Sequence, residues 1–302
     1  MKIFVTGATG FIGSSIVDEL LRRGHAVVGL ARSDASTAKL QAKGAQAHRG
    51  SIDDAASIVS VLNEVDGVIH AAFNHDFSTY VQNCLDDGAL LERMAESLRG
   101  SGKPLIATSG TTVIAPGRLA TEDQPADPTI PRSASERFLR FHEDGVRTSS
   151  VRLPPSVHGE GDTAFVPAAI ALARRAGVSA YIGDGANRWP AVHRDDAARL
   201  FCDVVERGET GHCFNAVQDE GIPFRVLAEA IGKGLGVPVR SLAPEKAAEH
   251  FGWFARFAAA DVPASSRLTR ERLSWSPQEN TLLFDLDSLP SYFDLSVKAL
   301  SI

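Results

Sequence analysis

The feature that most constrains this chain is a glycine-rich segment close to residue 1. Lys2–Thr6 is predicted to be a short buried strand, Gly7–Gly13 (GATGFIG) follows it, and an amphipathic helix is predicted over Phe11–Arg23. In such a unit the first glycine permits a tight turn, the second lets backbone approach a pyrophosphate, and the third lets the helix pack closely on the strand. The helix N-terminus adds free N–H groups and the positive end of its dipole. A plain strand–helix turn is the alternative, but the strand before and the helix after favour a dinucleotide site.

Strands and helices alternate through the first half of the chain. Further strands are predicted at 26–30, 45–48, 67–72, 105–109 and 148–153, with helices at about 34–43, 53–64, 78–98 and 133–143. Helical connections between strands imply a parallel sheet that is covered on both faces, which the continuous apolarity of VVGL and GVIHAA also fits. We therefore expect an α/β fold with a doubly wound parallel sheet, of the Rossmann type.

The sequence changes character after Leu153, where Pro- and Gly-rich loops become frequent. Helices are predicted at 165–175, 195–206 and 224–235, a strand at 211–217, and an irregular stretch from about 241 onward. We expect a dinucleotide-binding core over 1–153, to which 190–220 returns. A smaller C-terminal substrate-binding lobe is expected from 154–189 and 221–302.

Composition narrows the classes of partner. The 302 residues include 31 Lys and Arg against 37 Asp and Glu, a net charge of −6, so nucleic acid is not an expected partner. Cys84, Cys202 and Cys213 form no CxxC pair or Cys/His cluster, so we expect reduced thiols and no metal site. No apolar run approaches the roughly 20 residues that span a bilayer, and the start lacks a signal-peptide pattern. These features predict a cytoplasmic protein without membrane contact, acting on a small molecule.

The end of the second predicted strand bears on which dinucleotide binds. An acidic residue there holds the ribose 2′-hydroxyl of NAD, whereas NADP needs a cation for its 2′-phosphate. The chain has Ala31 where the acid is expected, followed by Arg32, Ser33 and Asp34. Arg32 can make a charge-assisted contact with phosphate, so we favour NADP over NAD. The alternative is that Arg32 is a solvated loop charge and Asp34 takes the ribose.

Five segments occur in a characteristic order over nearly the whole chain. They are TGATGFIG at 6–13, HAAF at 70–73, RLPPSVHGEGD at 152–162, GDGANRWPAVHRDDAARLF at 183–201 and SSRLTRERLSWSP at 265–277. Together they resemble the extended and atypical short-chain dehydrogenase/reductase superfamily, including NAD-dependent epimerase/dehydratase-like proteins. The resemblance implies hydride transfer with an NAD(P) cofactor and a homodimer that pairs through the helices near 78–98 and 133–143. The expected cofactor contacts are Thr6, Gly7, Thr9, Gly10, Phe11, Ile12, Gly13, Arg32, Ser33, Ser51, Ile52, Ala71, Ala72, Phe73, Pro154 and Val157.

One region departs from the family pattern. Such enzymes typically use a Tyr that transfers the proton, a Lys four residues later that lowers the Tyr pKa, and a Ser or Thr after the fifth strand. The matching region at 128–136 holds neither Tyr nor Lys, and Arg132 stands at the Lys or the Tyr position, depending on the alignment. Thr108–Thr112 keeps hydroxyl groups, with Gly110 at the usual place of the serine. The usual tyrosine mechanism is therefore in question.

Other side chains are candidates for the chemistry. Carbonyl reduction needs a hydride donor, a proton donor and hydrogen-bond donors around the developing alkoxide. The candidate catalytic residues are His75, Tyr80, Ser109, Thr111 and Arg132, and the candidate substrate contacts are Thr112, His158, Arg188 and Trp189. The alternative for His75 is a role in capping the helix near Ser78, and for Ser109 and Thr111 a role in satisfying backbone at a strand end.

The remaining polar and aromatic residues of the second half have structural interpretations. His193, Asp195 and Asp196 are expected to cap and anchor the helix that follows them. Tyr181 is expected in the core of the second lobe, and Tyr292 at its periphery.

Three hypotheses about function follow. The first is an NADP-dependent oxidoreductase that acts on a small carbonyl or alcohol by hydride transfer. The second is an NAD(P)-dependent epimerase or dehydratase, although epimerisation needs a base that works in both directions. The third is a non-catalytic NADP-binding sensor or scaffold, which the missing Tyr and Lys would also explain.

Overall fold

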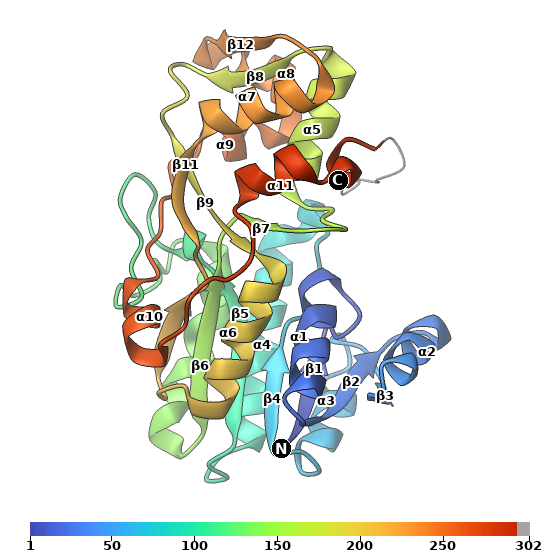
Figure 1. The fold of residues 1–302 in the computed structure, drawn as a ribbon. Coiled ribbons are helices and arrows are strands. Elements are labelled where there is room, and N and C mark those ends of the chain that lie inside the picture. Colours follow the sequence, from blue (N-terminus) through green and yellow to red (C-terminus); the bar gives the residue numbers. More distant parts are fainter. Residues whose placement is uncertain (295–302) are drawn as a thin grey trace.

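A computed structural model describes residues 1–294 and confirms the doubly wound α/β fold (Figure 1). Seven parallel strands form the large sheet in the order β10-β6-β5-β4-β1-β2-β3. Their bounds are β1 Lys2–Thr6, β2 Ala26–Ala31, β3 Gln46–Arg49, β4 Gly67–His70, β5 Pro104–Gly110, β6 Arg147–Leu153 and β10 His212–Asn215. The strand order reverses between β1 and β4, so the carboxyl ends of these two strands flank the place where ligands bind in such sheets.

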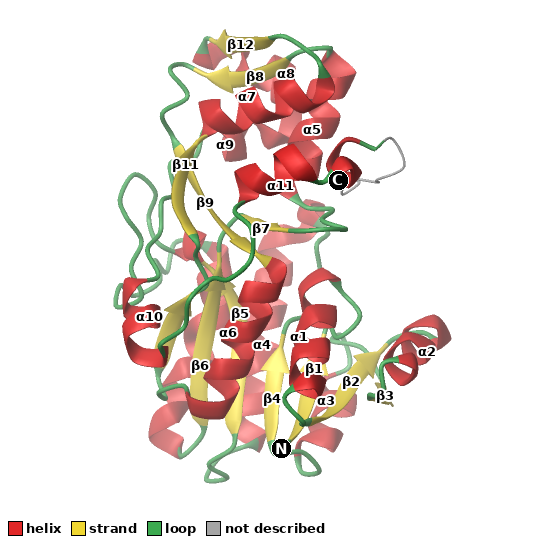
Figure 2. Cartoon of the chain, in the orientation of Figure 1, coloured by secondary structure: helices red, strands yellow, loops and turns green. Residues whose placement is uncertain are grey.

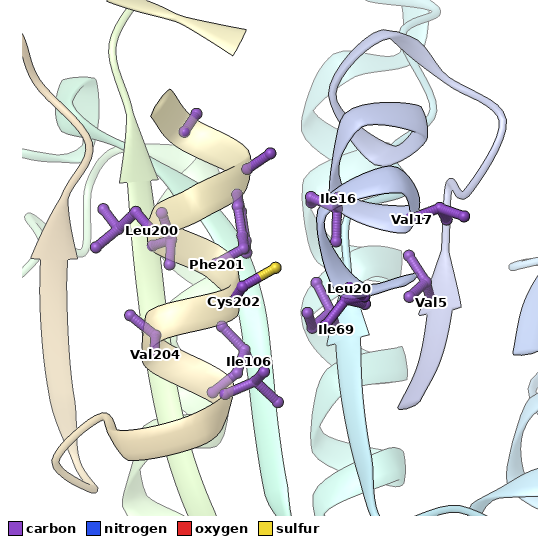
Figure 3. Close-up of a cluster of buried hydrophobic side chains, with 14 of the residues drawn as sticks. Val5, Ile16, Val17, Leu20, Ile69, Ile106, Leu200, Phe201, Cys202 and Val204 are labelled. Carbon is purple, nitrogen blue, oxygen red and sulfur yellow. The ribbon is translucent and has the colours of Figure 1, made fainter. Parts of the chain in front are cut away.

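Helices cover both faces of the large sheet. One face carries α1 (Phe11–Arg22) and α6 (Arg194–Arg207), whose apolar side chains pack on β1, β4 and β5 (Figure 3). The other face carries α3 (Ala55–Leu62), α4 (Tyr80–Ser97) and the 3₁₀ segment η3 (Pro131–Asp144), while α2 (Asp34–Ala42) packs against β2 and β3. Because both faces are buried, the central strands β1, β2 and β4 are largely apolar, whereas β6 buries the polar side chains of Ser149, Ser150 and Arg152.

The chain beyond β6 builds a smaller lobe over the carboxyl ends of the large sheet (Figure 2). A three-stranded sheet joins β11 (Asp219–Pro223), β9 (Arg188–His193) and β7 (Ser156–His158), and β12 (Val239–Leu242) pairs with β8 (Ser179–Ile182). The helices of this half are α5 Phe165–Ala176, α7 Phe224–Leu235, α8 Ala247–Phe251, α9 Ala255–Ala258, α10 Arg267–Leu273 and α11 Leu282–Ser288. The 3₁₀ turns are η1 Phe77–Thr79, η2 Thr111–Val113, η4 Pro244–Lys246, η5 Gly252–Phe254 and η6 Pro290–Phe293.

The second half also contributes to the large sheet. Helix α6 covers one of its faces and β10 adds its edge strand beside β6, whereas β9, in the same stretch of chain, belongs to the three-stranded sheet. One continuous stretch, from α6 to β10, therefore returns to the large sheet, and α10 contacts both of these elements.

Two local features were not specified by the sequence pattern. Helix α3 begins after Asp54, whose carboxylate accepts hydrogen bonds from the backbone N–H groups of Ala56 and Ser57. The stretch predicted as a regular helix at 133–143 forms 3₁₀ turns over Pro131–Asp144.

None of the helices within residues 1–294 combines the length and the apolar character that crossing a membrane requires.

Candidate functional site

The glycine loop lies in close contact with the end of β4. Gly7 has a φ of +66°, and a Cβ built on it would lie 2.7 Å from the carbonyl carbon of Ala71. A Cβ on Gly13 would lie 2.0 Å from the carbonyl oxygen of Gly7. Gly10 precedes α1, and within residues 1–294 no side chain caps the N-terminus of that helix. The loop thus leaves room for a pyrophosphate, and α1 offers it free N–H groups.

The segment after β2 holds the candidate 2′-phosphate residues. Arg32 is exposed and has no partner within residues 1–294. Ser33 caps α2, its hydroxyl accepting a hydrogen bond from the N–H of Ser36 at 3.2 Å. The exposed carboxylate of Asp34, the alternative ribose partner, forms an ion pair with Arg49 at 2.9 Å. Arg32 is therefore an uncompensated cation at the strand end that distinguishes the two dinucleotides.

Two hollows in the described part of the molecule differ in their relation to the predicted site. The smaller, about 320 Å³, has Ile52, Asn74, Asn83 and Asp87 in its walls and adjoins the predicted cofactor segment. The larger, about 610 Å³, is lined by residues of the 122–128 loop, η3 and β10, with Arg152 and Arg272. None of the predicted site residues lines the larger hollow, so size alone does not identify the site.

A buried hydrogen-bonded chain connects β1, β4, α4 and η3. Thr6 Oγ1 lies 2.9 Å from His70 Nδ1, and His70 Nε2 lies 3.0 Å from Asp87 Oδ1. Arg132 donates from Nη1 to Asp87 Oδ2 at 2.7 Å and from Nη2 to the carbonyl of Thr108 at 2.8 Å. Burial opposes ionisation of the carboxyl, but the charge of Arg132 and the hydrogen bond from His70 outweigh it and lower the pKa of Asp87. Arg132 is thus held in place by a buried anion.

His70 and Asp87 were not among the predicted site residues. A signal for Asp87 exists in the sequence, because it falls in the buried stripe of α4 together with Cys84, Leu91 and Met94. An acid in such a stripe requires a partner. The sequence does not identify that partner, since Arg132 is 45 residues away along the chain.

Both candidate proton donors contact the ring of Phe73. The guanidinium carbon of Arg132 lies 4.2 Å from the Phe73 ring centroid, and the rings of His75 and Tyr80 lie 5.3 Å and 6.3 Å from it. Burial, followed by the neighbouring Cys84, raises the pKa of Tyr80 to about 12. The ring of His75 is accessible to solvent, yet the protein around it disfavours the charged form and, with the charge of Arg132, lowers its pKa. At neutral pH Tyr80 therefore keeps its proton and His75 is a weak base.

The end of β5 carries three hydroxyl groups in two environments. Ser109 Oγ and Thr111 Oγ1 are buried and have no hydrogen-bond partner within residues 1–294. Thr112 is exposed, and its Oγ1 lies 3.3 Å from the position that a Cβ on Gly110 would take. The Thr112 hydroxyl therefore occupies space beside the position that the resemblance assigns to the serine.

The substrate contacts predicted in the second half of the chain are buried or already paired with other side chains. His158 is fully buried, and its Nδ1 lies 2.7 Å from Asp285 Oδ2. Trp189 is 2% exposed in the core of the small lobe. Arg188 is bound by both carboxylate oxygens of Asp261 at 2.9 Å. Other side chains enclose both His158 and Trp189, so their role as substrate contacts stays a prediction that no exposed surface supports.

The loop after β6 is held by the C-terminal segment. Tyr292, predicted at the periphery, is 5% exposed, and its hydroxyl accepts a hydrogen bond from the N–H of Gly159 at 3.1 Å. The same hydroxyl lies 3.3 Å from Asp162 Oδ2. Burial raises the pKa of Asp162 to about 7. Pro154 and Val157, the cofactor contacts predicted in this region, are buried where β6 passes into β7.

The structural role predicted for the segment after β9 is confirmed. The side chain of His193 caps α6 by accepting a hydrogen bond from the N–H of Asp195 at 3.2 Å. Asp196 is buried and accepts hydrogen bonds from the backbone N–H groups of Gln278 and Glu279. This segment therefore anchors α6 and the C-terminal segment to each other.

Comparisons with known proteins agree with this architecture. The model of the NAD dependent epimerase/dehydratase family matches residues 3–216. An uncharacterized protein of Schizosaccharomyces pombe is 50% identical over 296 residues, which cover 97% of this chain and 100% of the relative. A 2-alkyl-3-oxoalkanoate reductase of Stenotrophomonas maltophilia is 27% identical over 261 residues, 79% of this chain and 77% of the relative. The crystal structure of a dTDP-glucose 4,6-dehydratase from Streptomyces venezuelae, with NAD bound, superposes with a TM-score of 0.77 at 21% identity over 97% of both chains.

Proposed function

The chain belongs to the NAD-dependent epimerase/dehydratase family, and we propose that it is an NAD(P)-dependent reductase of small carbonyl compounds. One observation supports reduction most directly: the groups that follow β4, together with Arg132 beside the end of β5, are uncharged side chains and a paired cation. Tyr80 keeps its proton, His75 is a weak base, and Arg132 is neutralised by Asp87. Carbonyl reduction consumes a proton, whereas epimerases and dehydratases begin by removing one from an alcohol. The similarity to a reductase of oxoalkanoates supports the same direction.

The proposed roles follow from the positions of the side chains. When bound, the reduced cofactor supplies the hydride that the carbonyl carbon accepts, while the C=O π bond breaks and the oxygen takes a proton. Thr112 donates a hydrogen bond that orients the carbonyl oxygen, and Tyr80 supplies the proton. Arg132, held by Asp87, positions the segment that carries Tyr80 and the end of β5 through its contacts with the Phe73 ring and the carbonyl of Thr108. The epimerase or dehydratase alternative needs a stronger base than these residues provide.

The reaction is tested on a panel of aldehydes and ketones, following NADPH and NADH oxidation. We expect Tyr80→Phe to lower kcat by roughly 100-fold, because general acid catalysis typically contributes at least that factor. Tyr181→Phe, at a half-buried tyrosine of the small lobe, is the matched control and should retain full activity. Undiminished turnover by Tyr80→Phe would remove Tyr80 from the mechanism. Cofactor binding without turnover of any carbonyl would favour the non-catalytic sensor instead.

The preference for NADP is a second part of the proposal. Two observations support it: Arg32 has no counter-ion within residues 1–294 that would compete with a 2′-phosphate, and Asp34 is neutralised by Arg49. Loss of one charge-assisted contact should weaken NADPH binding about tenfold or more in Arg32→Asp, while NADH binding changes little or improves. Fluorescence titration with each cofactor measures this. An unchanged preference for NADPH would refute the assignment.

We also propose that two copies pair through α4 and η3. These two elements pack along each other on one face of the sheet, and α4 leaves Val81 57% and Leu85 40% exposed. Exposed apolar side chains on one helix are typical of an interface. Light scattering on the Val81→Glu and Leu85→Glu variants should show a monomer where the unaltered protein is a dimer.

A further inference from the structure

Aromatic rings meet where the β4–α4 segment contacts the small lobe. The ring of Phe77 lies 6.3 Å from Phe165 of α5, and 6.4 Å from both Trp253 of η5 and Phe257 of α9. On its other side Phe77 stacks on Tyr80, with the ring centroids 5.7 Å apart and the planes inclined by 10°. These five side chains, the outer rings, thus come from both lobes.

A second set of rings lies behind the outer rings and is fully packed. Trp189, Phe224, Phe251 and Phe254 are all between 0% and 3% exposed and form the aromatic core of the small lobe. Four of the outer rings are half-buried, and the fifth, Trp253, is 39% exposed. Because the inner set already fills the core, the solvent-facing area of the outer rings is apolar surface that folding leaves uncovered.

The position of the outer rings relates them to the proposed reaction. Phe77 and Tyr80 belong to the segment that leaves β4, whose carboxyl end contacts the glycine loop through Gly7 and Ala71. Tyr80 is also the proposed proton donor. A carbonyl oxygen that receives its proton from Tyr80 therefore has its substituent next to Phe77 and the rings of the small lobe.

The chemistry of these rings favours one class of substituent. Aromatic side chains in edge-to-face and stacked pairs accept a further flat ring with the same geometry, and they exclude water. A sugar nucleotide would instead require free cations for its phosphate groups. Arg188, predicted to contact the substrate, is bound by Asp261. The guanidinium of Arg256 lies over the outer ring of Phe257, 4.8 Å from its centroid, so the cation beside these rings makes a cation–π contact.

Resting on the proposed function, we propose that the outer rings bind the flat, uncharged substituent of the substrate. The substrate class is then aryl or conjugated aldehydes and ketones, and Trp253 is a residue that determines specificity. The small lobe supplies this specificity, while the large sheet supplies the cofactor site and the proton donor.

The test compares benzaldehyde and cinnamaldehyde with butanal. We expect the unaltered protein to have a kcat/KM for the two aromatic substrates at least tenfold above that for butanal. Trp253→Ala should reduce this ratio about tenfold, mainly through KM for the aromatic substrates. Phe284→Ala is the matched control, since Phe284 is 54% exposed on α11 and is not one of the outer rings. Equal kcat/KM values for butanal and the aromatic aldehydes, or an unchanged ratio in Trp253→Ala, would overturn the proposal.

A binding measurement separates failure of this proposal from failure of the proposed function. Benzamide, which carries an aryl carbonyl but is not reduced, is titrated into the protein in the presence of NADP. Binding that weakens about tenfold in Trp253→Ala supports the aryl site even if no carbonyl is turned over. Absence of benzamide binding in a protein that reduces butanal overturns the aryl site and leaves the proposed function standing.

Discussion

Two buried aspartates on opposite sides of the candidate site differ in their surroundings. Asp87, on α4 behind the large sheet, is 6% exposed, and Asp162, in the loop that leads into the small lobe, is 4% exposed. Asp87 is bound by Arg132 and His70, whereas Asp162 receives hydrogen bonds from Tyr292 and a backbone N–H. The pKa of the first is lowered and that of the second is raised to about 7.

The comparison teaches that burial does not by itself decide the charge of a carboxyl. Desolvation is the largest influence on both groups and disfavours the carboxylate in both. A guanidinium at 2.7 Å reverses that effect at Asp87, and a hydroxyl at 3.3 Å does not reverse it at Asp162. The large-sheet side of the site is therefore held by a permanent ion pair, and the small-lobe side by a carboxyl that titrates near neutral pH.

The largest expected effect comes from removing the cation that Asp87 requires. Arg132→Met should lower the free energy of unfolding by about 3–5 kcal/mol, because it leaves a buried carboxylate without its charge partner. Asp87→Leu combined with Arg132→Met should recover most of the loss, since no buried charge remains. Urea unfolding of the single and double variants measures both values. A stability of Arg132→Met within about 1 kcal/mol of the unaltered protein would show that the ion pair is not needed.

Replacing Asp162 should change the free energy of unfolding by an intermediate amount. Unlike Asp87, whose charged form is stabilised, Asp162 favours the folded state when it is protonated. The folded protein binds this proton more tightly than the unfolded chain, whose carboxyl has the ordinary pKa of 3.8. Stability contributed by this group is therefore fully present below about pH 4 and is lost as the pH rises towards 7. Asp162→Asn should remove this dependence and be about 1–3 kcal/mol more stable than the unaltered protein at pH 8.

Urea unfolding at pH 4.5 and pH 8 tests the Asp162 prediction. The difference between the two proteins should appear at pH 8 and largely vanish at pH 4.5. If Asp162→Asn is equally destabilised at both pH values, the carboxyl has a hydrogen-bonding role that does not depend on its charge.

The smallest expected effect concerns the neutral partner of Asp162. Tyr292→Phe removes the hydroxyl that accepts from the Gly159 N–H and leaves that buried donor unpaired. The cost should be about 1 kcal/mol, as for a single neutral hydrogen bond, and therefore well below that of Arg132→Met. Thermal unfolding of Tyr292→Phe, compared with the unaltered protein and with the control variant Tyr181→Phe, measures this loss of stability. A loss as large as that of Arg132→Met would contradict the distinction between the ionic and the neutral region.

Local patterns in the sequence predicted most of the fold. The helix expected at 224–235 is observed at Phe224–Leu235, because its apolar period is regular and Gly236, with a φ of +66°, ends it. The strands of the large sheet were found because both of their faces are buried. The stretch at 131–144 was less predictable, since its helical pattern does not distinguish 3₁₀ turns from an α-helix.

The candidate site was only partly predictable. The sequence identified candidates that follow β4 and β5, and parallel strands place their carboxyl ends at one edge of the sheet. The structure brings Phe73, His75, Tyr80 and Arg132 together as ring and cation contacts. The buried position of Tyr292 and the enclosure of His158 and Trp189 were not predicted, because their surroundings come from segments far away in the sequence, such as Asp285 for His158.

The sequence by itself determined the dinucleotide loop and the parallel sheet. Both depend on local sterics and on short apolar periods, and Gly7 and Gly13 are needed because a Cβ would collide with backbone only a few residues away or on the adjacent strand. Only the tertiary structure decided which buried charges are paired and which rings face the site. Asp87 and Asp162 are the same residue type with nearly the same burial, so their difference lies in the distant segments that fold against them. The electrostatics of a buried group depends on partners within a few ångströms, and chain order does not specify those partners.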